Sequence, residues 1–199
     1  MSYVQPCSES IVGMQALSNL TGLKRLNLAH NELACAADKV ATSVSHLTNM
    51  QTLNLSGNGL STDTLATCLA SMHQLQSLDI SWELKTPPPA SYGAGLNAVI
   101  QRLTGLTRLA LRYSGLCAVE CVKIAAMLPA MSHLAFLDLR GNCISSAGAG
   151  LLLRVLERSE ALRGVDMSGN DVDCNEPTIA CMMPRFRLSW GRHGDREVL

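Results

Sequence analysis

The sequence predicts an α/β repeat fold, in which short β-strands alternate with α-helices along one continuous array. One pattern recurs six times and alternates apolar and polar residues with a period of two, as a half-buried strand does. The segments between these copies change to the 3.6-residue period of a helix. Leucine accounts for 32 of the 199 residues, against 7 aromatic residues, which suits a repetitive aliphatic core.

The six copies have the form of LKRLNLAHNEL, and positions 1, 4, 6 and the terminal apolar position are apolar in every one. They begin at Leu23, Met50, Leu75, Leu106, Leu134 and Leu162. Position 9 is Asn in four copies, where an amide side chain can satisfy backbone groups of the bend after the strand; these are Asn31, Asn58, Asn142 and Asn170. Copy three has Glu83 near this position and copy four has Ser114. The asparagine arrangement is therefore predicted for the other four turns only.

The helical period appears between the copies, and serines before Ala147 could cap the last of these helices. The predicted helices span 32–44, 62–72, 93–103, 119–127 and 145–158. Pro129 ends the fourth of them. The run Pro87–Pro89 lies in the insertion that lengthens repeat three, and it predicts a stiff surface bulge.

The LxxLxLxxNxL strand motif and the SxxGAxxLxxxL helix resemble leucine-rich-repeat proteins of the ribonuclease-inhibitor-like subclass. The resemblance covers Leu23 to Val172 and implies an α/β horseshoe, a solenoid with parallel strands on its concave face, helices on its convex face and a protein-binding role. We expect residues 1–22 to form a partial repeat or capping helix, 23–172 the six repeats, and 173–199 a C-terminal cap or partly mobile tail.

The charge balance argues against broad nucleic-acid or membrane binding, because 16 basic and 16 acidic residues give no net charge. The arginines of the C-terminal tail leave an alternative open, a small contact with RNA or an acidic partner, against a solvated capping segment; they are Arg185, Arg187, Arg192 and Arg196. The sequence contains no run of 18 apolar residues and no signal-peptide pattern.

The cysteines and histidines do not form a motif for catalysis, a cofactor or a metal. The eight cysteines are scattered without a CxxC pair, which favours a reducing, cytoplasmic compartment over a disulfide framework. Cys117, Cys121 and Cys143 are interpreted as buried packing residues. We expect isolated His46, His73 and His133 to be loop residues, because a site needs several groups in mutual geometry.

The outward positions 3, 5, 7 and 8 of the strand motif give the candidate binding residues. They gather aromatic and charged side chains at the centre of the concave face, a composition typical of binding hot spots. The candidates are Asp79, Trp82, Arg108, Arg112, Tyr113, Phe136, Asp138 and Arg140. The alternative is that these side chains only stack on their neighbours along the sheet.

We therefore expect a non-catalytic, intracellular interaction module or scaffold that binds a protein partner on its concave face. One alternative is a constitutive subunit of a large cytoskeletal, axonemal or ubiquitin-ligase complex, with the open ends and the proline bulge as contacts. A third is a regulator of small GTPases, as some relatives are, although no motif of theirs can be matched residue by residue to this chain.

Overall fold

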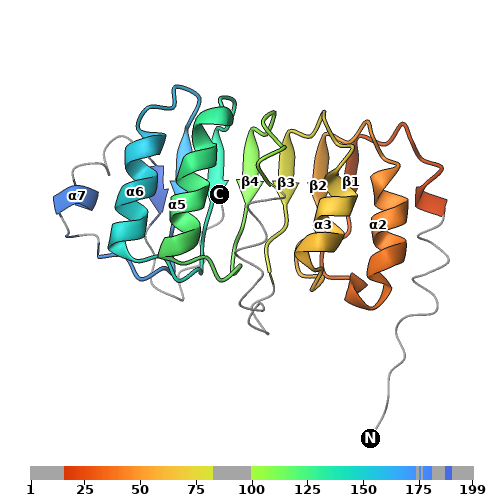
Figure 1. The fold of residues 1–199 in the computed structure, drawn as a ribbon, viewed down its shortest axis with the longest axis horizontal. Coiled ribbons are helices and arrows are strands. Elements are labelled where there is room, and N and C mark those ends of the chain that lie inside the picture. The colour runs from red at the N-terminus through yellow and green to blue at the C-terminus, as the bar shows by residue number, and fades with distance from the viewer. Residues whose placement is uncertain (1–15, 83–99, 174, 176, 181–186, 190–199) are drawn as a thin grey trace, which may run out of the picture.

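The computed structural model describes residues 16–82, 100–173, 175, 177–180 and 187–189. Within them, seven parallel strands form one sheet in chain order, with every strand pairing to the next (Figure 1). The strands are β1 (Arg25–Asn27), β2 (Thr52–Asn54), β3 (Ser77–Asp79), β4 (Arg108–Ala110), β5 (Phe136–Asp138), β6 (Gly164–Asp166) and β7 (Arg187–Ser189). β1 to β6 lie at positions 3 to 5 of the six predicted copies, which confirms the α/β solenoid.

The strand register places equivalent residues of successive copies side by side. Leu26 pairs with Leu53, Leu53 with Leu78, and the row continues to Val165. Because neighbouring side chains of a strand point to opposite faces, this apolar row points into the core and positions 3 and 5 point away from it. Leu23, Leu26 and Leu28 of the first copy are only half-buried, since no strand among the described residues pairs with the outer edge of β1.

Helices cover one face of the sheet. They are α2 (Ala37–Ser45), α3 (Thr62–Leu69), α5 (Ala118–Met127), α6 (Ser146–Leu156) and the short α7 (Pro177–Ala180), with 3-10 turns η1 (Leu33–Ala36) and η2 (Leu128–Ala130). α2 packs against α3, and α5 against α6, as two pairs along the sheet (Figure 1). Ser61 and Ser145 accept the N-cap hydrogen bonds of α3 and α6, and Pro129 lies in the 3-10 turn after α5.

Four predicted helices agree with the structure to within a few residues. The first begins as a 3-10 turn at Leu33, and the second ends at Leu69 rather than at 72. Most of the predicted helix 93–103, the proline bulge and most of the predicted N-terminal cap lie outside the described residues. In the C-terminal segment, β7 adds a strand to the sheet and Ile179 of α7 is buried.

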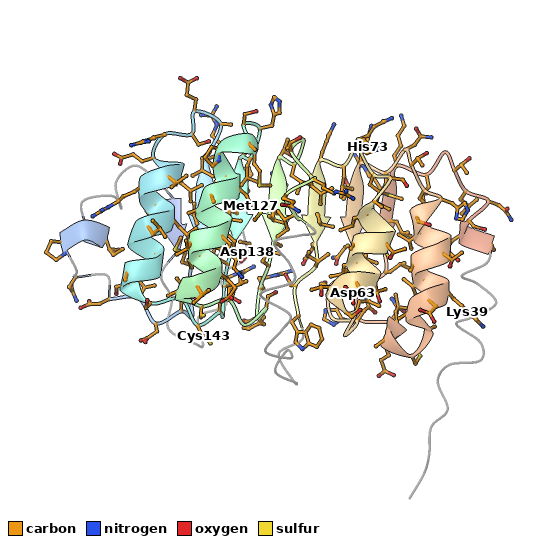
Figure 2. The ribbon with its side chains drawn as sticks, viewed as in Figure 1. Lys39, Asp63, His73, Met127, Asp138 and Cys143 are labelled. Atoms are coloured by element: carbon orange, nitrogen blue, oxygen red, sulfur yellow. The ribbon has the colours of Figure 1, made fainter. Side chains whose placement is uncertain are left out.

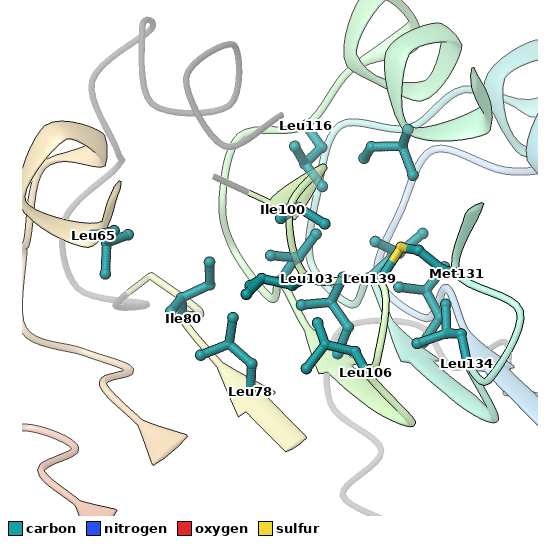
Figure 3. Packing of buried hydrophobic residues seen from close by; sticks show 14 of the residues in the cluster. Leu65, Leu78, Ile80, Ile100, Leu103, Leu106, Leu116, Met131, Leu134 and Leu139 are labelled. Atoms are coloured by element: carbon teal, nitrogen blue, oxygen red, sulfur yellow. The ribbon is translucent and has the colours of Figure 1, made fainter. Parts of the chain in front are cut away.

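One continuous aliphatic core lies between the sheet and the helices (Figure 3). Leu106, Leu134 and Leu139 come from motif positions 1 and 6, and each is at most 2% exposed. Burying a side chain of this size contributes about 1.5–3 kcal/mol. The core therefore continues from repeat to repeat, which explains how strands of three residues persist.

The asparagines at position 9 confirm the role predicted for them. Asn142 is 6% exposed, its Oδ1 accepts hydrogen bonds from the N–H groups of Ser114 and Leu116, and its Nδ2 donates to the carbonyls of Leu111 and Leu139. Asn58 binds the turn of the first repeat in the same way. Each amide thus joins its own turn to that of the preceding repeat.

Candidate functional site

The face of the sheet opposite the helices is called here the open face, and it corresponds to the concave face predicted above. It consists of the residues at motif positions 3, 5, 7 and 8. In the described part of the chain no helix covers it (Figure 1).

An alternating series of carboxylates and guanidinium groups crosses the open face from β3 to β6; we call it the Asp–Arg ladder. Its members, in order, are Asp79, Arg112, Asp138, Arg140 and Asp166. Arg112 forms an ion pair with Asp79 and lies 3.7 Å from Asp138, measured from Nε to Oδ2. Arg140 bonds Asp138 at 2.7 Å through Nη2 and reaches Asp166 at 3.3 Å through Nε.

The Asp–Arg ladder depends on a second role of position 5. In five of the six copies an Asn or Asp at this position accepts a hydrogen bond from the backbone N–H two residues later, which fixes the end of the strand; they are Asn27, Asn54, Asp79, Asp138 and Asp166. The recurrence is visible in the sequence, but sequence reasoning missed it. Ala110 occupies the position in copy four, and Arg112 bridges the carboxylates on either side of that gap.

The charged groups of the Asp–Arg ladder are fixed by ion pairs and hydrogen bonds to one another. Their charged side chains are between 12% and 33% exposed. The hydroxyl of Ser81 also accepts hydrogen bonds from the backbone N–H and Nε of Arg112. Hydrogen bonds to Asp138 raise the pKa of Arg140, with the charges of Asp138 and Asp166 acting in the same direction against partial burial. The structure therefore brings together Asp79, Arg112, Asp138 and Arg140, largely as partners of one another.

A second group on the open face is an exposed pair from neighbouring strands, Arg108 and Phe136. The two residues are register partners at position 3 of β4 and β5. The guanidinium carbon of Arg108 lies 4.2 Å from the centroid of the Phe136 ring, a cation–π contact. Phe136 is nevertheless 38% exposed, although the fold makes no demand for an aromatic residue at this position.

The other two predicted aromatic residues are less accessible than expected. Trp82 is half-buried and packs against the core. Tyr113 is half-buried, with a backbone φ of +55°, and its ring lies against Gly141, where an added Cβ would be 2.0 Å from Cε1 of the ring. The expectation of three exposed rings is thus wrong for Trp82 and Tyr113: Trp82 packs against the core, and the left-handed backbone of Tyr113 turns its ring back onto Gly141 of the next repeat.

The cysteines differ partly from their prediction. Cys121 is buried as expected, and burial raises its pKa to about 12. Cys117 is only half-buried, and its thiol donates a hydrogen bond to Glu120. Cys143 is wrongly predicted as a packing residue: it is exposed at the edge of the molecule (Figure 2), because the turn directs its side chain outward. In contrast to the free thiols of these three and Cys68, Cys35 is disulfide-bonded.

The histidines follow the prediction. His46, His73 and His133 are exposed residues in turns. Within the described ranges, His, Cys, Asp and Glu side chains form no group of three or more that could hold a metal ion.

The outer helix face also varies along the molecule. Lys39 of α2 and Asp63 of α3 are exposed polar residues (Figure 2). By contrast, α5 exposes Val119 and Val122, at 59% and 57%, and α6 exposes Leu151 at 37%. No helix among the described residues is both long and apolar enough to cross a membrane.

Comparison with known proteins finds similarity to leucine-rich-repeat proteins, in agreement with the repeat pattern of the sequence. A family model described as "Leucine Rich repeat" matches residues 46–63 and 130–153. The chain is 46% identical over 59 residues to the transforming growth factor beta activator LRRC33 of Danio rerio, a match that covers 30% of this chain and 9% of that protein.

Two solved structures resemble the fold. One is the leucine-rich repeat-containing protein LegL7 of Legionella pneumophila, with a TM-score of 0.54 and 23% identity over 82% of this chain and 53% of that one. The other is a protein of Bacteroides fragilis, with a TM-score of 0.62 and 12% identity over 98% of this chain and 64% of that one. The chain thus spans less than two thirds of each relative, and the ribonuclease-inhibitor-like subclass stays a prediction.

Proposed function

Because the chain is a leucine-rich-repeat protein, we propose that it is a non-catalytic interaction module that binds a protein partner on its open face. Leucine-rich-repeat domains in general bind protein partners, and solenoids do so on extended surfaces lined by equivalent positions of successive repeats. The identity of the surface and the nature of the partner belong to this proposal.

The observation that carries the proposal is the exposed Arg108–Phe136 pair. The ring of Phe136 is 38% exposed at the centre of the sheet beneath the guanidinium group of Arg108, at a motif position where other copies have the small residues Thr52, Ser77 and Gly164. Aromatic and arginine side chains are the residues most often found at binding hot spots.

The Asp–Arg ladder supports the same proposal by its rigidity. Arg112 and Arg140 are each held by two carboxylates, so few rotamers would be lost when a partner covers them. The ladder also supports a non-catalytic role, since its carboxylates already accept backbone hydrogen bonds and ion pairs and are poorly placed to exchange protons with a substrate.

A second candidate function, a constitutive subunit of a larger assembly, is favoured by the apolar outer face of α5 and α6. α5 packs against α6, and both helices expose aliphatic side chains, Val122 on α5 and Leu151 on α6. A neighbouring subunit could bury these side chains.

One affinity-capture experiment separates the two functions. The wild-type chain, Phe136→Ala and Val122→Asp are compared as baits in lysate of the source, after urea unfolding has shown that all three are folded. We expect Phe136→Ala to retain at most about a tenth of the captured partner, as hot-spot truncations do, and Val122→Asp to retain it fully. Loss with Val122→Asp alone would contradict open-face binding and favour the assembly.

We also propose that the chain works in a reducing, intracellular compartment. The support is that Cys68, Cys117, Cys121 and Cys143 are free thiols, two of them in the core, whereas the disulfide of Cys35 is an argument on the other side. Alkylation in denaturant without reductant, followed by mass measurement, counts the thiols of the isolated chain. Eight labelled cysteines would support the proposal, whereas persistence of the Cys35 disulfide would leave six and contradict it.

A further inference from the structure

We infer that Arg108 binds a carboxylate of the partner, so that the open face selects a peptide segment in which an acidic side chain adjoins an apolar one. The inference rests on the proposed function and specifies the chemistry of its partner. It depends on how the charges of the open face are distributed.

The three central arginines of the open face differ in their partners. Arg112 and Arg140 are neutralised by carboxylates of the Asp–Arg ladder. Arg108 is exposed, and among the described residues its guanidinium group contacts the Phe136 ring and has no carboxylate or hydrogen-bond acceptor. It is therefore the central cation whose N–H donors remain available.

The ring beneath Arg108 prepares it for this role. A guanidinium group above an aromatic face keeps the donors at its rim directed outward, and these match the two oxygens of a carboxylate. The neighbours in the same row, Ser77 and Gly164, have small side chains or none. Arg108 and Phe136 therefore project beyond their small neighbours in this row. The exposed part of the Phe136 ring lies beside the cation, where an apolar side chain of the partner can contact it.

The local charge favours a peptide over a nucleic acid. The ladder has three carboxylates and two guanidinium groups, so with Arg108 the central open face has no net charge. Nucleic acids require a positive surface that neutralises several phosphates. A single carboxylate next to an apolar side chain requires one cation and one exposed ring, as found here.

Peptide display tests this recognition directly. A random peptide library is selected on the full chain, on Arg108→Glu and on Arg25→Glu. Arg25 is the matched control, because it is an exposed arginine at the same motif position at the far end of the sheet. We expect the wild type and Arg25→Glu to enrich peptides with Asp or Glu beside an apolar residue, and Arg108→Glu to enrich Lys or Arg there.

The affinity of one enriched peptide gives the magnitude. Arg108→Gln should weaken its binding at least about tenfold and flatten its dependence on salt concentration, because a charge-assisted contact is lost. Phe136→Ala should weaken the same peptide by a similar factor.

The other outcomes are distinguishable. If Arg108→Glu still enriches acidic peptides while Phe136→Ala loses them, the inference about Arg108 is wrong and the proposed function stands. If the wild type enriches no peptide, or Phe136→Ala binds the enriched peptide unchanged, the inference about Arg108 and the proposed function are both contradicted. Tighter binding of a mixed-sequence single-stranded RNA than of the peptide, abolished by Arg108→Glu, would overturn carboxylate recognition in favour of phosphate.

Discussion

Asn142→Leu is expected to lower the free energy of unfolding by about 4 kcal/mol. The substitution keeps the volume of the side chain but removes acceptors for the N–H groups of Ser114 and Leu116 and donors for the carbonyls of Leu111 and Leu139. A buried backbone group without a partner costs about 1–3 kcal/mol. Three groups lose their partner, because the carbonyl of Leu139 also accepts a hydrogen bond from Nδ2 of Asn170. Urea unfolding followed by circular dichroism measures the change.

Asn31→Leu is the matched control for this prediction. Asn31 occupies the same motif position, and its Nδ2 donates to the carbonyls of Leu28 and Ala29, but it is exposed in the first repeat. Water can replace its hydrogen bonds, so we expect a loss below about 1 kcal/mol. Equal effects of the two substitutions would show that the buried amide does not hold the turns of repeats four and five together.

The aliphatic skeleton of this fold is predictable from the sequence because each repeat encodes it locally. Period-two spacing places Leu109 and Leu137 on one side of the sheet, and the repeat distance places them in register. Asn58 and Asn142 follow from the same pattern, since a bend with buried carbonyls needs an amide. The strands and the four described helices of the repeats could therefore be predicted from the sequence.

The accessibility of the candidate site was not predictable in the same way, because it depends on partners in neighbouring repeats. Arg112 and Arg140 carry the same charge as Arg108, but the placement of Asp79, Asp138 and Asp166 pairs each of them with carboxylates. Trp82 lies at an outward position, yet it packs against the core. Motif position alone thus predicts which face a side chain joins, and contacts between repeats decide whether it stays available.

At motif position 8, the preference for glycine can be predicted from the sequence, but the contact that a neighbouring ring makes with that glycine cannot. The backbone there is left-handed in Gly57, Gly141 and Gly169, and also in His30 and Tyr113. Glycines recurring at one motif position are typical of such a conformation. The sequence does not reveal that each of these two rings lies over the glycine of the following repeat, where an added Cβ would be 2.2 Å from Nδ1 of His30 or 2.0 Å from Cε1 of Tyr113.

Gly141→Ala is therefore expected to lower the free energy of unfolding by about 3 kcal/mol. Placing a side chain at a φ of +64° costs about 1 kcal/mol, and overpacking against the Tyr113 ring adds about 1–3 kcal/mol. Gly59→Ala is the matched control, because its φ is +63° while its added Cβ would lie 3.5 Å from Ala34, an ordinary contact. It should show the conformational cost alone, about 1 kcal/mol.

A double-mutant cycle with Tyr113→Ala isolates the contact between ring and glycine. Once the ring is gone, adding a methyl group at position 141 should cost only about 1 kcal/mol, as at Gly59, so the coupling between the two substitutions should be at least about 1 kcal/mol. If the effects of the two substitutions on the free energy of unfolding are additive, the Tyr113 ring can move away from position 141 without loss of stability. In that case the contact with Gly141 would not hold the Tyr113 ring in place, and Tyr113 would remain a candidate for partner binding beside Phe136.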